Sequence, residues 1–345
     1  MRFGYENPGT GPLEAFENGV LAEKHGFDFF WVGDHYVDLD GARLEPWTVL
    51  SAVAAKTRKI MLCSGVTDPQ RTHPTKTAHS VASLDTISRG RAVLGIGAGE
   101  AMNIVPFGLP WEEPVTRVRR VVEAIQVIRR LWSSSKYRRA SFHGSFYSLK
   151  RAFLAQSPTQ RPYPPIYVGA ISGRKMLEVV GRYADGWYSW LNTPDSFRER
   201  WKIITAAATR AGRSAREIDA STQLMISVCR GAAEKRKAVL SAKVTLLVET
   251  NLLKKLGEGH LATLPQYQNC LASPRYAKEV VRIAREIPDA IAEMTAAIGG
   301  EDEVREKIEE FRKVGVKQVT VSELIPPSRP RRTIEFLGRI IRRSG

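Results

Sequence analysis

Short, almost entirely apolar runs alternate with longer amphipathic runs along most of this 345-residue chain. The short runs are rich in β-branched and aromatic residues, which is typical of strands that are buried on both faces. Regular alternation of such strands with helices favours a parallel sheet that is covered by helices. We expect eight strands, at Arg2–Glu6, Asp28–Gly33, Lys59–Val66, Arg91–Gly97, Pro165–Gly169, Asp185–Trp190, Ile218–Val228 and Gln318–Ser322.

The runs between the strands have the apolar spacing of helices that bury one face. Three of them end in glycine, at Gly26, Gly212 and Gly315, and glycine readily adopts the left-handed conformation that ends a helix. Eight strand–helix units are the number that closes a (β/α)8 TIM barrel. We therefore predict an α/β protein of this class, a TIM barrel with insertions, and an open doubly wound sheet is the alternative. The helices are expected at Leu13–His25, Trp47–Ala55, Thr75–Ile87, Val115–Trp132, Lys175–Tyr183, Ser196–Ala211, Ala232–Val248, Glu301–Val314 and Thr333–Ile341.

No shift in composition marks a linker, so we expect a single TIM-barrel domain over residues 1–345. Two insertions interrupt the alternation. The first, at about 135–160, contains FHGSFYS and is predicted to form a hairpin around Gly144. The second, at about 254–300, is predicted to be mostly helical, with breaks at Pro265, Pro274 and Pro288. The loops that follow barrel strands build the active site, so the residues just past the strand ends matter most.

Composition excludes several protein classes. Hydrophobic residues make up 43% of the chain and charged residues 26%, and no apolar run approaches the ~18 residues of a membrane span. The start, MRFGYENPG, lacks the apolar segment of a signal peptide, and three cysteines are too few for a disulfide scaffold, so we expect a cytoplasmic protein. The net charge is +16, which we interpret as the charged surface of a thermophile protein; an anionic ligand and nucleic acid are the alternatives.

Three strand ends carry side chains that are suited to acid–base chemistry. Glu6 ends the first strand, where a carboxylate can donate a proton or face a cationic intermediate. His35 follows the second strand and can exchange a proton near neutral pH. Its neighbour Asp34 would face the other way on an extended chain, so the two are not predicted to form a dyad. Glu100 lies just past the fourth strand and is a second candidate acid.

Glycines follow three of the strands. Gly65 suggests a bulge or a close approach of the backbone to a planar ligand. The stretch GIGAG at 95–99 also allows a close approach, but it lacks the third glycine of a dinucleotide-binding fingerprint. The fifth strand leads into GAISGRK at 169–175, where small residues before a helix leave N–H groups for an anion. We expect a phosphate site there, and a plain tight turn is the alternative.

Other patterns that carry chemistry are missing from the sequence. GxxxxGK[ST], HExxH, CxxC and GxSxG do not occur, and the six histidines lack the spacing of metal ligands, so no metal site is predicted. The arginine-rich stretch RPRRTIEFLGRIIRR spaces its apolar residues as an amphipathic helix would. We interpret it as a helix that seals the barrel rather than as a DNA-binding segment.

Six motifs, taken in order, resemble the bacterial-luciferase-like superfamily, and within it the branch that uses the deazaflavin coenzyme F420. They are MRFGYE, WVGDHY, CSGVTDPQRTHP, SLDTISRGRAVLGIGAGEAMN, PPIYVGAISG and ADGW. The resemblance runs from Arg2 to about Ala211 and resumes at Glu301–Ile341. It implies an enzyme that is an F420-dependent oxidoreductase, and FMN, which other members of the superfamily use, is the alternative cofactor.

The resemblance also implies the positions that bind the coenzyme. The Gly65–Val66 bond matches a cis peptide bond of the family, a bulge that backs the deazaflavin ring. The positions that match contacts with the ring, its side chain or its polar edge are Asp34, Ala98, Gly99 and Asn103. The positions that match the backbone around the coenzyme's phosphate are Gly169, Ala170, Ile171 and Ser172.

Two activities of this branch compete. MRFGYE, DHY, GVTDP and GVKQVTVSELIPP are similar to methylenetetrahydromethanopterin reductases, in which Glu6 matches an acid that is proposed to act. GAGEAMN is similar to F420-dependent alcohol and sugar-phosphate dehydrogenases, in which His35 and Glu100 match the acid–base pair. The reductase is our first expectation and the dehydrogenase the second. An FMN-dependent monooxygenase and a non-catalytic (deaza)flavin-binding protein follow.

The expected partners are a small-molecule substrate and further copies of the chain. The resemblance implies a homodimer or a higher homo-oligomer. We expect neither nucleic acid nor a membrane as a partner.

Overall fold

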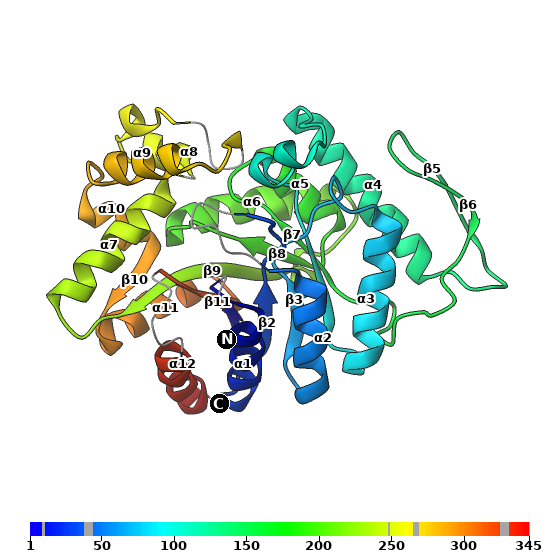
Figure 1. Ribbon diagram of the computed structural model, residues 1–345, viewed down its shortest axis with the longest axis horizontal. Helices are drawn as coiled ribbons and strands as arrows, with labels where there is room; N and C mark the ends of the chain where they lie inside the picture. The colour runs from blue at the N-terminus through cyan, green and yellow to red at the C-terminus, as the bar shows by residue number, and fades with distance from the viewer. Residues whose placement is uncertain (9–10, 38–43, 248, 265–268, 325–330, 345) are drawn as a thin grey trace.

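The expected strands close into a parallel barrel in the computed structural model (Figure 1). The structure describes residues 1–8, 11–37, 44–247, 249–264, 269–324 and 331–344. Neighbouring barrel strands pair in parallel, and β11 pairs with β1 to complete the ring, so the predicted TIM barrel is confirmed. In order around the ring the strands are β1 (Arg2–Glu6), β2 (Phe29–Val32), β3 (Met61–Ser64), β4 (Ala92–Ile96), β7 (Ile166–Gly169), β8 (Gly186–Ser189), β9 (Asp219–Val228) and β11 (Gln318–Glu323).

Helices cover the outside of the barrel. Six of the helices that the structure describes begin with proline, which lacks the N–H that the first turn of a helix cannot satisfy. Gly26, Gly212 and Gly315 follow helix ends with φ of +87°, +69° and +95°, as predicted. The helices are α1 (Pro12–Lys24), α2 (Pro46–Lys56), α3 (Pro74–Ser88), α4 (Pro114–Trp132), α5 (Arg174–Tyr183), α6 (Pro194–Arg210), α7 (Ala232–Leu246), α11 (Glu301–Lys313) and α12 (Arg331–Ser344).

Alternate residues of each strand face two different cores. Phe30 packs into the large core between the barrel and its helices, whereas Trp31 belongs to a smaller aromatic cluster with Tyr167 and Tyr188. The rings of Trp31 and Tyr188 lie 4.4 Å apart between centroids. Aromatic side chains thus fill the middle of the barrel, and a ligand can enter only at its ends.

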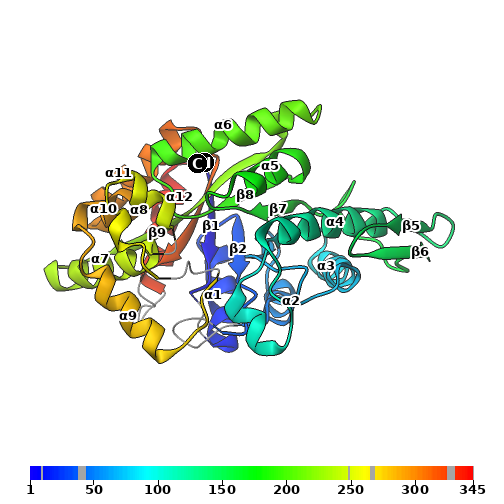
Figure 2. The ribbon, with the colours of Figure 1, turned by 90° about the horizontal axis from the view of Figure 1, so that it is seen from above.

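The first insertion is a hairpin, as predicted. Strands β5 (Ala140–His143) and β6 (Ser148–Ala152) pair antiparallel around Gly144. Figures 1 and 2 show the hairpin extending away from the barrel beyond α4. The hydroxyl of Tyr147 donates to the carbonyl of Pro69 at 2.7 Å and so attaches the hairpin to the loop after β3.

The second insertion is mainly helical, but it contains a strand that the sequence analysis missed. Its helices are α8 (Thr250–Lys255), α9 (Pro274–Ala284) and α10 (Asp289–Thr295), and β10 (Ala296–Gly299) follows. β10 pairs in parallel with Met225–Val228 of β9. The four residues AAIG carry no alternating pattern, so they resemble the tail of the preceding helix. Pro265 lies outside the described residues.

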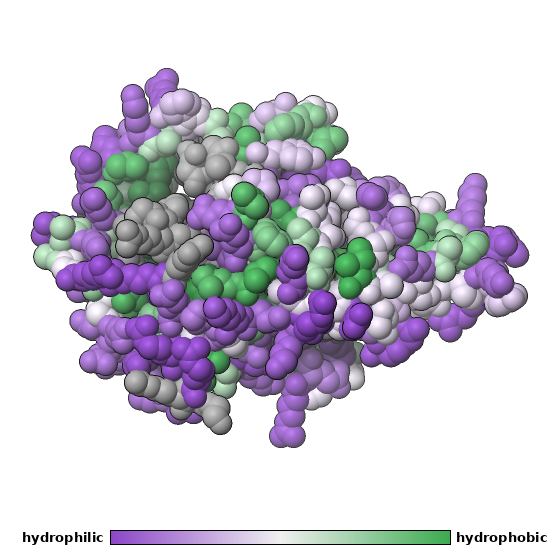
Figure 3. Space-filling model, turned by 60° about the horizontal axis from the view of Figure 1, so that its bottom comes forward, coloured by the Kyte–Doolittle hydropathy of each residue, from purple (hydrophilic) through white to green (hydrophobic). Residues whose placement is uncertain are grey.

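No helix in the described ranges is both long enough and apolar enough to cross a membrane. The face shown in Figure 3 is covered mainly by hydrophilic residues, with hydrophobic residues in small patches between them. Among the described residues no group of three or more His, Cys, Asp and Glu side chains could hold a metal ion.

Candidate active site

The three acid–base candidates follow three different barrel strands. Glu6 is the last residue of β1, His35 comes three residues after β2, and Glu100 comes four residues after β4. Because the strands are parallel, their carboxyl ends lie at the same end of the barrel, which we call the mouth. The loop after β4 forms two short 3₁₀ turns there, η1 (Ala101–Asn103) and η2 (Val105–Phe107).

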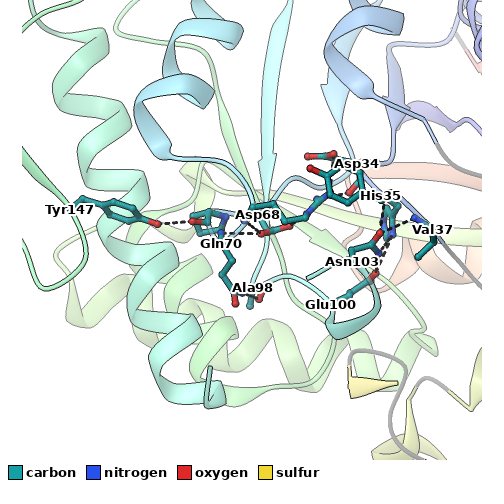
Figure 4. A network of polar contacts seen from close by, with 12 residues as sticks. Asp34, His35, Val37, Asp68, Gln70, Ala98, Glu100, Asn103 and Tyr147 are labelled. Carbon is teal, nitrogen blue, oxygen red and sulfur yellow. Dashed lines mark hydrogen bonds and ion pairs between the residues drawn. The ribbon is translucent and has the colours of Figure 1, made fainter. Parts of the chain in front are cut away.

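His35 and Glu100 form the centre of a polar network at the mouth (Figure 4). Nδ1 of His35 lies 3.1 Å from Oε2 of Glu100. Nδ2 of Asn103 lies 3.2 Å from His35 Nδ1 and 3.4 Å from Glu100 Oε2. His35 and Glu100 are partly exposed and Asn103 is buried, so a substrate can reach the pair while the amide stays covered.

Backbone groups determine which end of the Asn103 amide faces the pair. Oδ1 of Asn103 accepts hydrogen bonds from the N–H groups of Tyr36 at 2.7 Å and Val37 at 3.0 Å. Only the oxygen of an amide can accept, so the NH2 group must face His35 and Glu100. Asn103 therefore joins the loops after β2 and β4 and presents a donor to the acid–base pair.

This arrangement gives the imidazole two hydrogen-bonded states. Nδ1 of His35 can donate to Glu100 or accept from Asn103, but it cannot do both at once. The two states of a neutral ring differ in which nitrogen carries the proton. The network can therefore hold His35 in either tautomer, which is what a group that takes up and returns a proton needs.

Asp34 pairs with Arg71, from the loop after β3. Nη1 of Arg71 lies 3.3 Å from Oδ1 of Asp34, and Nη2 donates to the Asp34 carbonyl at 2.6 Å. Asp68 holds the guanidinium from its other side through Nε. Burial raises the pKa of the Asp34 carboxyl, and the opposing effect of Arg71 is smaller. His35 is also among the charges that lower the pKa of the Asp34 carboxyl, and the absence of a dyad between the two stays a prediction.

Glu6 is buried at the end of the barrel interior. It accepts a hydrogen bond from the hydroxyl of Tyr188 on β8. A Cβ atom on Gly65 would lie 3.0 Å from Oε2 of Glu6, so the carboxyl packs beneath the β3 bulge. Burial, followed by the Glu6 charge, raises the pKa values of Tyr188 and Cys63 well above their usual range. Glu6 therefore lies beneath the β3 bulge, and the His35–Glu100 pair lies at the mouth.

The Gly65–Val66 peptide bond is cis, as the resemblance implied. Val66 fills space that glycines leave open. A Cβ atom on Gly97 would lie 2.8 Å from Cγ2 of Val66, and one on Gly169 would lie 3.1 Å from the same atom. A Cβ atom on Gly95 would lie 2.0 Å from the Ser64 carbonyl oxygen. Gly95 thus admits the backbone of β3 and Gly97 admits the Val66 side chain, and their expected approach to a ligand stays a prediction.

The loops after β3 and β4 enclose a polar atom with no hydrogen-bond partner among the described residues, Oε1 of Gln70. Nε2 of the same amide donates to the Ala98 carbonyl at 2.6 Å. Gly99 has φ of +76°, and a Cβ atom there would lie 2.9 Å from Gln70 Nε2. Ala98 and Gly99 therefore lie against an amide whose oxygen can accept a hydrogen bond from a ligand.

The predicted phosphate loop, Gly169–Ser172, precedes α5, and Gly173 is the N-cap of that helix. The hydroxyl of Ser172 donates to Oε2 of Glu249 at 3.0 Å and accepts from Asn251 at 3.1 Å. Burial raises the pKa of Glu249, and Arg200, at 3.8 Å from its Oε1, lowers it by less. Because the Ser172 hydroxyl has committed its hydrogen, the donors that the loop offers an anion are backbone N–H groups.

Sequence reasoning missed several residues that shape the site. Gln70 and Arg71 follow the β3 bulge directly in the stretch TDPQR, and a polar run after a strand end is a signal that could have found them. Glu249 lies 77 residues from Ser172, and no local pattern connects the two.

Comparison with known proteins identifies the family. The model for the family described as luciferase-like monooxygenase matches residues 4–318. The chain belongs to the luciferase-like monooxygenase family. This confirms the superfamily that the motifs resembled and makes the chain an oxidoreductase.

Individual relatives of this family member include enzymes of the F420-dependent branch. A 5,10-methylenetetrahydromethanopterin reductase of Archaeoglobus fulgidus is 30% identical over 323 residues, 93% of this chain and 92% of the relative. An F420-dependent glucose-6-phosphate dehydrogenase of Microbacterium testaceum is 35% identical over 66% of this chain and 68% of its own. The solved structure of a coenzyme F420-dependent tetrahydromethanopterin reductase from Methanopyrus kandleri is 26% identical and superposes with a TM-score of 0.82, covering 98% of this chain and 97% of that one.

Proposed function

We propose that this luciferase-like enzyme uses coenzyme F420 and transfers a hydride between the deazaflavin and a small carbon centre. The first choice of reaction is reduction of the methylene group on a tetrahydromethanopterin-type carrier. One observation carries this choice: similarity to a reductase of that name extends over 93% of the chain, whereas similarity to the sugar-phosphate dehydrogenase covers 66%.

The residues at the mouth fit a deazaflavin. Such a ring is flat and has an edge of carbonyl and N–H groups, and Gln70 Oε1 is a buried acceptor without a partner in the described part of the chain. Gln70, Ala98 and Gly99 would hold the ring. The backbone from Gly169 to Ser172 would hold the phosphate, because N–H groups before a helix favour an anion.

A bound deazaflavin supplies the hydride, and the protein supplies position, charge and protons. Asn103 ties the loops after β2 and β4 together through the N–H groups of Tyr36 and Val37, which keeps His35 and Glu100 in place during the reaction. The Glu100 carboxylate, partly exposed at the mouth, stabilises positive charge that develops on an iminium-type substrate. Glu6 adds negative charge from beneath the β3 bulge.

The second choice is oxidation of an alcohol or a sugar phosphate, and the His35–Glu100 contact of 3.1 Å favours it. In that reaction Glu100 accepts the Nδ1 hydrogen of His35, and the other ring nitrogen takes the hydroxyl proton of the substrate. Reduction of the methylene carrier needs a proton donor instead of a base, because the C–N bond that breaks to give the iminium leaves a nitrogen that must be protonated. Glu6 or Glu100 can supply that proton without His35.

The His35→Ala variant distinguishes the two reactions. The reductase predicts that this variant keeps at least a tenth of the wild-type kcat with methylenetetrahydromethanopterin and reduced F420. The dehydrogenase predicts a loss of 10²–10⁴-fold with an alcohol or a sugar phosphate, which is the usual contribution of a general base. A variant that is inactive with the methylene carrier but still binds F420 would contradict the first choice.

The cofactor is tested by parallel absorbance titrations with F420 and with FMN. We expect F420 to bind at least tenfold more tightly. Purified protein that retains FMN and consumes oxygen would instead select a monooxygenase, and binding of F420 without hydride transfer to any carbon substrate would select a non-catalytic binding protein.

A further inference from the structure

Two aromatic rings and a valine lie exposed beside the acid–base pair. Tyr36 is 53% exposed and Phe107 is 48% exposed, and their ring centroids are 4.5 Å apart. Val105, in the same 3₁₀ turn as Phe107, is also exposed. We call these three side chains the apolar shelf.

The shelf is attached directly to the catalytic network. Tyr36 follows His35 in the chain, and its N–H donates to Oδ1 of Asn103 at 2.7 Å. Phe107 lies four residues beyond Asn103, at the end of η2. Figure 4 shows that His35, Asn103 and Glu100 lie together where these two loops meet. A molecule whose reacting carbon lies at His35 and Glu100 can therefore reach the shelf.

The shelf is also held in a fixed position. The guanidinium of Arg71 lies 5.0 Å from the centroid of the Tyr36 ring, which is a favourable cation–π distance. Arg71 is itself buried and held by Asp68 and Asp34. A ring that is immobilised in this way loses little conformational entropy when a ligand packs on it.

Exposed apolar side chains occur on both of the loops that carry His35 and Glu100. The described residues include eleven large hydrophobic side chains that are exposed, and three of them form this shelf at the mouth. Single exposed apolar residues need no explanation, but two exposed rings in contact and a nearby valine beside a reactive site mark a binding surface. Its chemistry suits a flat apolar or aromatic group and offers little to a sugar or a phosphate.

Resting on the proposed hydride transfer, we propose that the apolar shelf binds an aromatic heterocycle that carries the reacting carbon. The substrate is then a one-carbon unit on a large planar ring system, and a small aliphatic alcohol or a sugar phosphate leaves the shelf empty. Tyr36 and Phe107 determine substrate specificity and take no part in proton transfer.

The test compares Tyr36→Ala and Phe107→Ala with two controls. Tyr36→Phe keeps the ring, and Tyr137→Ala removes a tyrosine that is 87% exposed on the first insertion. The bond from Tyr36 to Asn103 uses the backbone N–H, so these substitutions leave the loop connection intact. For each protein we measure KM and kcat with methylenetetrahydromethanopterin, and the Kd for F420 by fluorescence titration.

We expect the two shelf variants to raise KM for the methylene carrier at least tenfold, with kcat and the F420 Kd within about twofold of wild type. Both controls should behave like wild type. An unchanged KM in both shelf variants would overturn the proposal. A matching loss of F420 affinity would assign the shelf to the coenzyme and would also overturn it.

A binding measurement separates failure of the shelf from failure of the proposed function. Calorimetry with tetrahydromethanopterin alone needs no hydride transfer, and we expect at least tenfold weaker binding to the shelf variants than to wild type and to Tyr36→Phe. If wild type binds this ligand on the shelf but never transfers a hydride from F420, the proposed function fails and the shelf stands. If wild type does not bind it, or binds it no better than the shelf variants do, the shelf proposal is wrong.

Discussion

Asn103 connects the architecture of the mouth to its chemistry. Its oxygen is occupied by two backbone N–H groups, so its nitrogen can only donate toward His35 and Glu100. If His35 and Glu100 exchange protons with the substrate as proposed, Asn103 acts through them and is a positioning residue.

Changing Asn103 to Asp tests this role. The aspartate keeps acceptors for the two N–H groups but places a second carboxylate beside Glu100. The added negative charge repels the Glu100 carboxylate and attracts the protonated imidazole, so it favours the protonated forms of the network. We expect the acidic limb of the kcat/KM pH profile to move to higher pH and kcat to fall about tenfold. Steady-state kinetics across pH 5–9 measure both. An unmoved limb would show that Asn103 only holds the loops.

The carboxyl of Glu323, at the end of β11, leads us to predict that the stability of the folded protein depends on pH. Burial raises the pKa of its carboxyl to about 8, although the Tyr5 hydroxyl donates to it at 2.9 Å. The unfolded chain releases this proton near pH 4.5, so between about pH 4.5 and 8 the folded state holds more protons. Stability therefore falls as pH rises through that window, by about 5 kcal/mol if the shift is fully expressed.

The variant that checks this is Glu323→Gln, which stays neutral. Urea denaturation should show equal stability for variant and wild type near pH 4.5, and a variant that is more stable by about 3–5 kcal/mol at pH 8. Glu306→Gln, at an exposed glutamate, is the matched control and should track wild type throughout. A constant difference between Glu323→Gln and wild type at all pH values would contradict the assignment.

At the residue scale, the sequence predicted groups that lie at strand ends. His35, Glu100 and Asn103 were found because each stands in a recognisable motif past a strand. Gln70 and the Tyr36–Phe107 contact were missed, since their roles depend on which loops meet in space. A local pattern carries no information on contacts such as Tyr36 with Phe107, which are 71 residues apart.

The packing of β3 against β4 gives a prediction at the scale of elements. A methyl group on Gly95 would lie 2.0 Å from the Ser64 carbonyl oxygen, and backbone cannot move aside as a flexible side chain can. We expect Gly95→Ala to destabilise the fold by about 3 kcal/mol or more, because the two strands must separate. Thermal denaturation measures the loss.

Gly173→Ala is the control for that substitution. A methyl group there meets nothing within 4 Å, and φ is −61°, so we expect a change within about 0.5 kcal/mol. Equal melting temperatures for Gly95→Ala and Gly173→Ala would contradict the packing between β3 and β4.

Strand and helix placement followed closely from periodicity because barrel strands are buried on both faces and read as apolar runs. β10 was not predicted because it is only four residues long and directly follows α10. These residues form a strand because they pair with Met225–Val228, which lie 71 residues earlier in the chain. A local sequence pattern cannot show such a pairing.

Charge is a property of the whole molecule, and it predicts a salt dependence. The net charge is +16, and between Glu123 and Glu178 the chain has no acidic residue at all. Coenzyme F420 carries a phosphate and glutamates, so a basic surface raises its local concentration. We expect its Kd to rise several-fold between 50 and 500 mM NaCl, measured by fluorescence titration. A flat response would mean that the charge plays no part in coenzyme binding.

β9 is ten residues long and is shared between two structures. Its first part pairs with β8, its middle pairs with β11, and its last four residues pair with β10 from the second insertion. Protein engineers who exchange this insertion between family members therefore cannot cut at its helices alone. A graft that leaves out Ala296–Gly299 would remove the strand that pairs with the last four residues of β9. The unpaired backbone groups of β9 could then pair with another chain and cause aggregation.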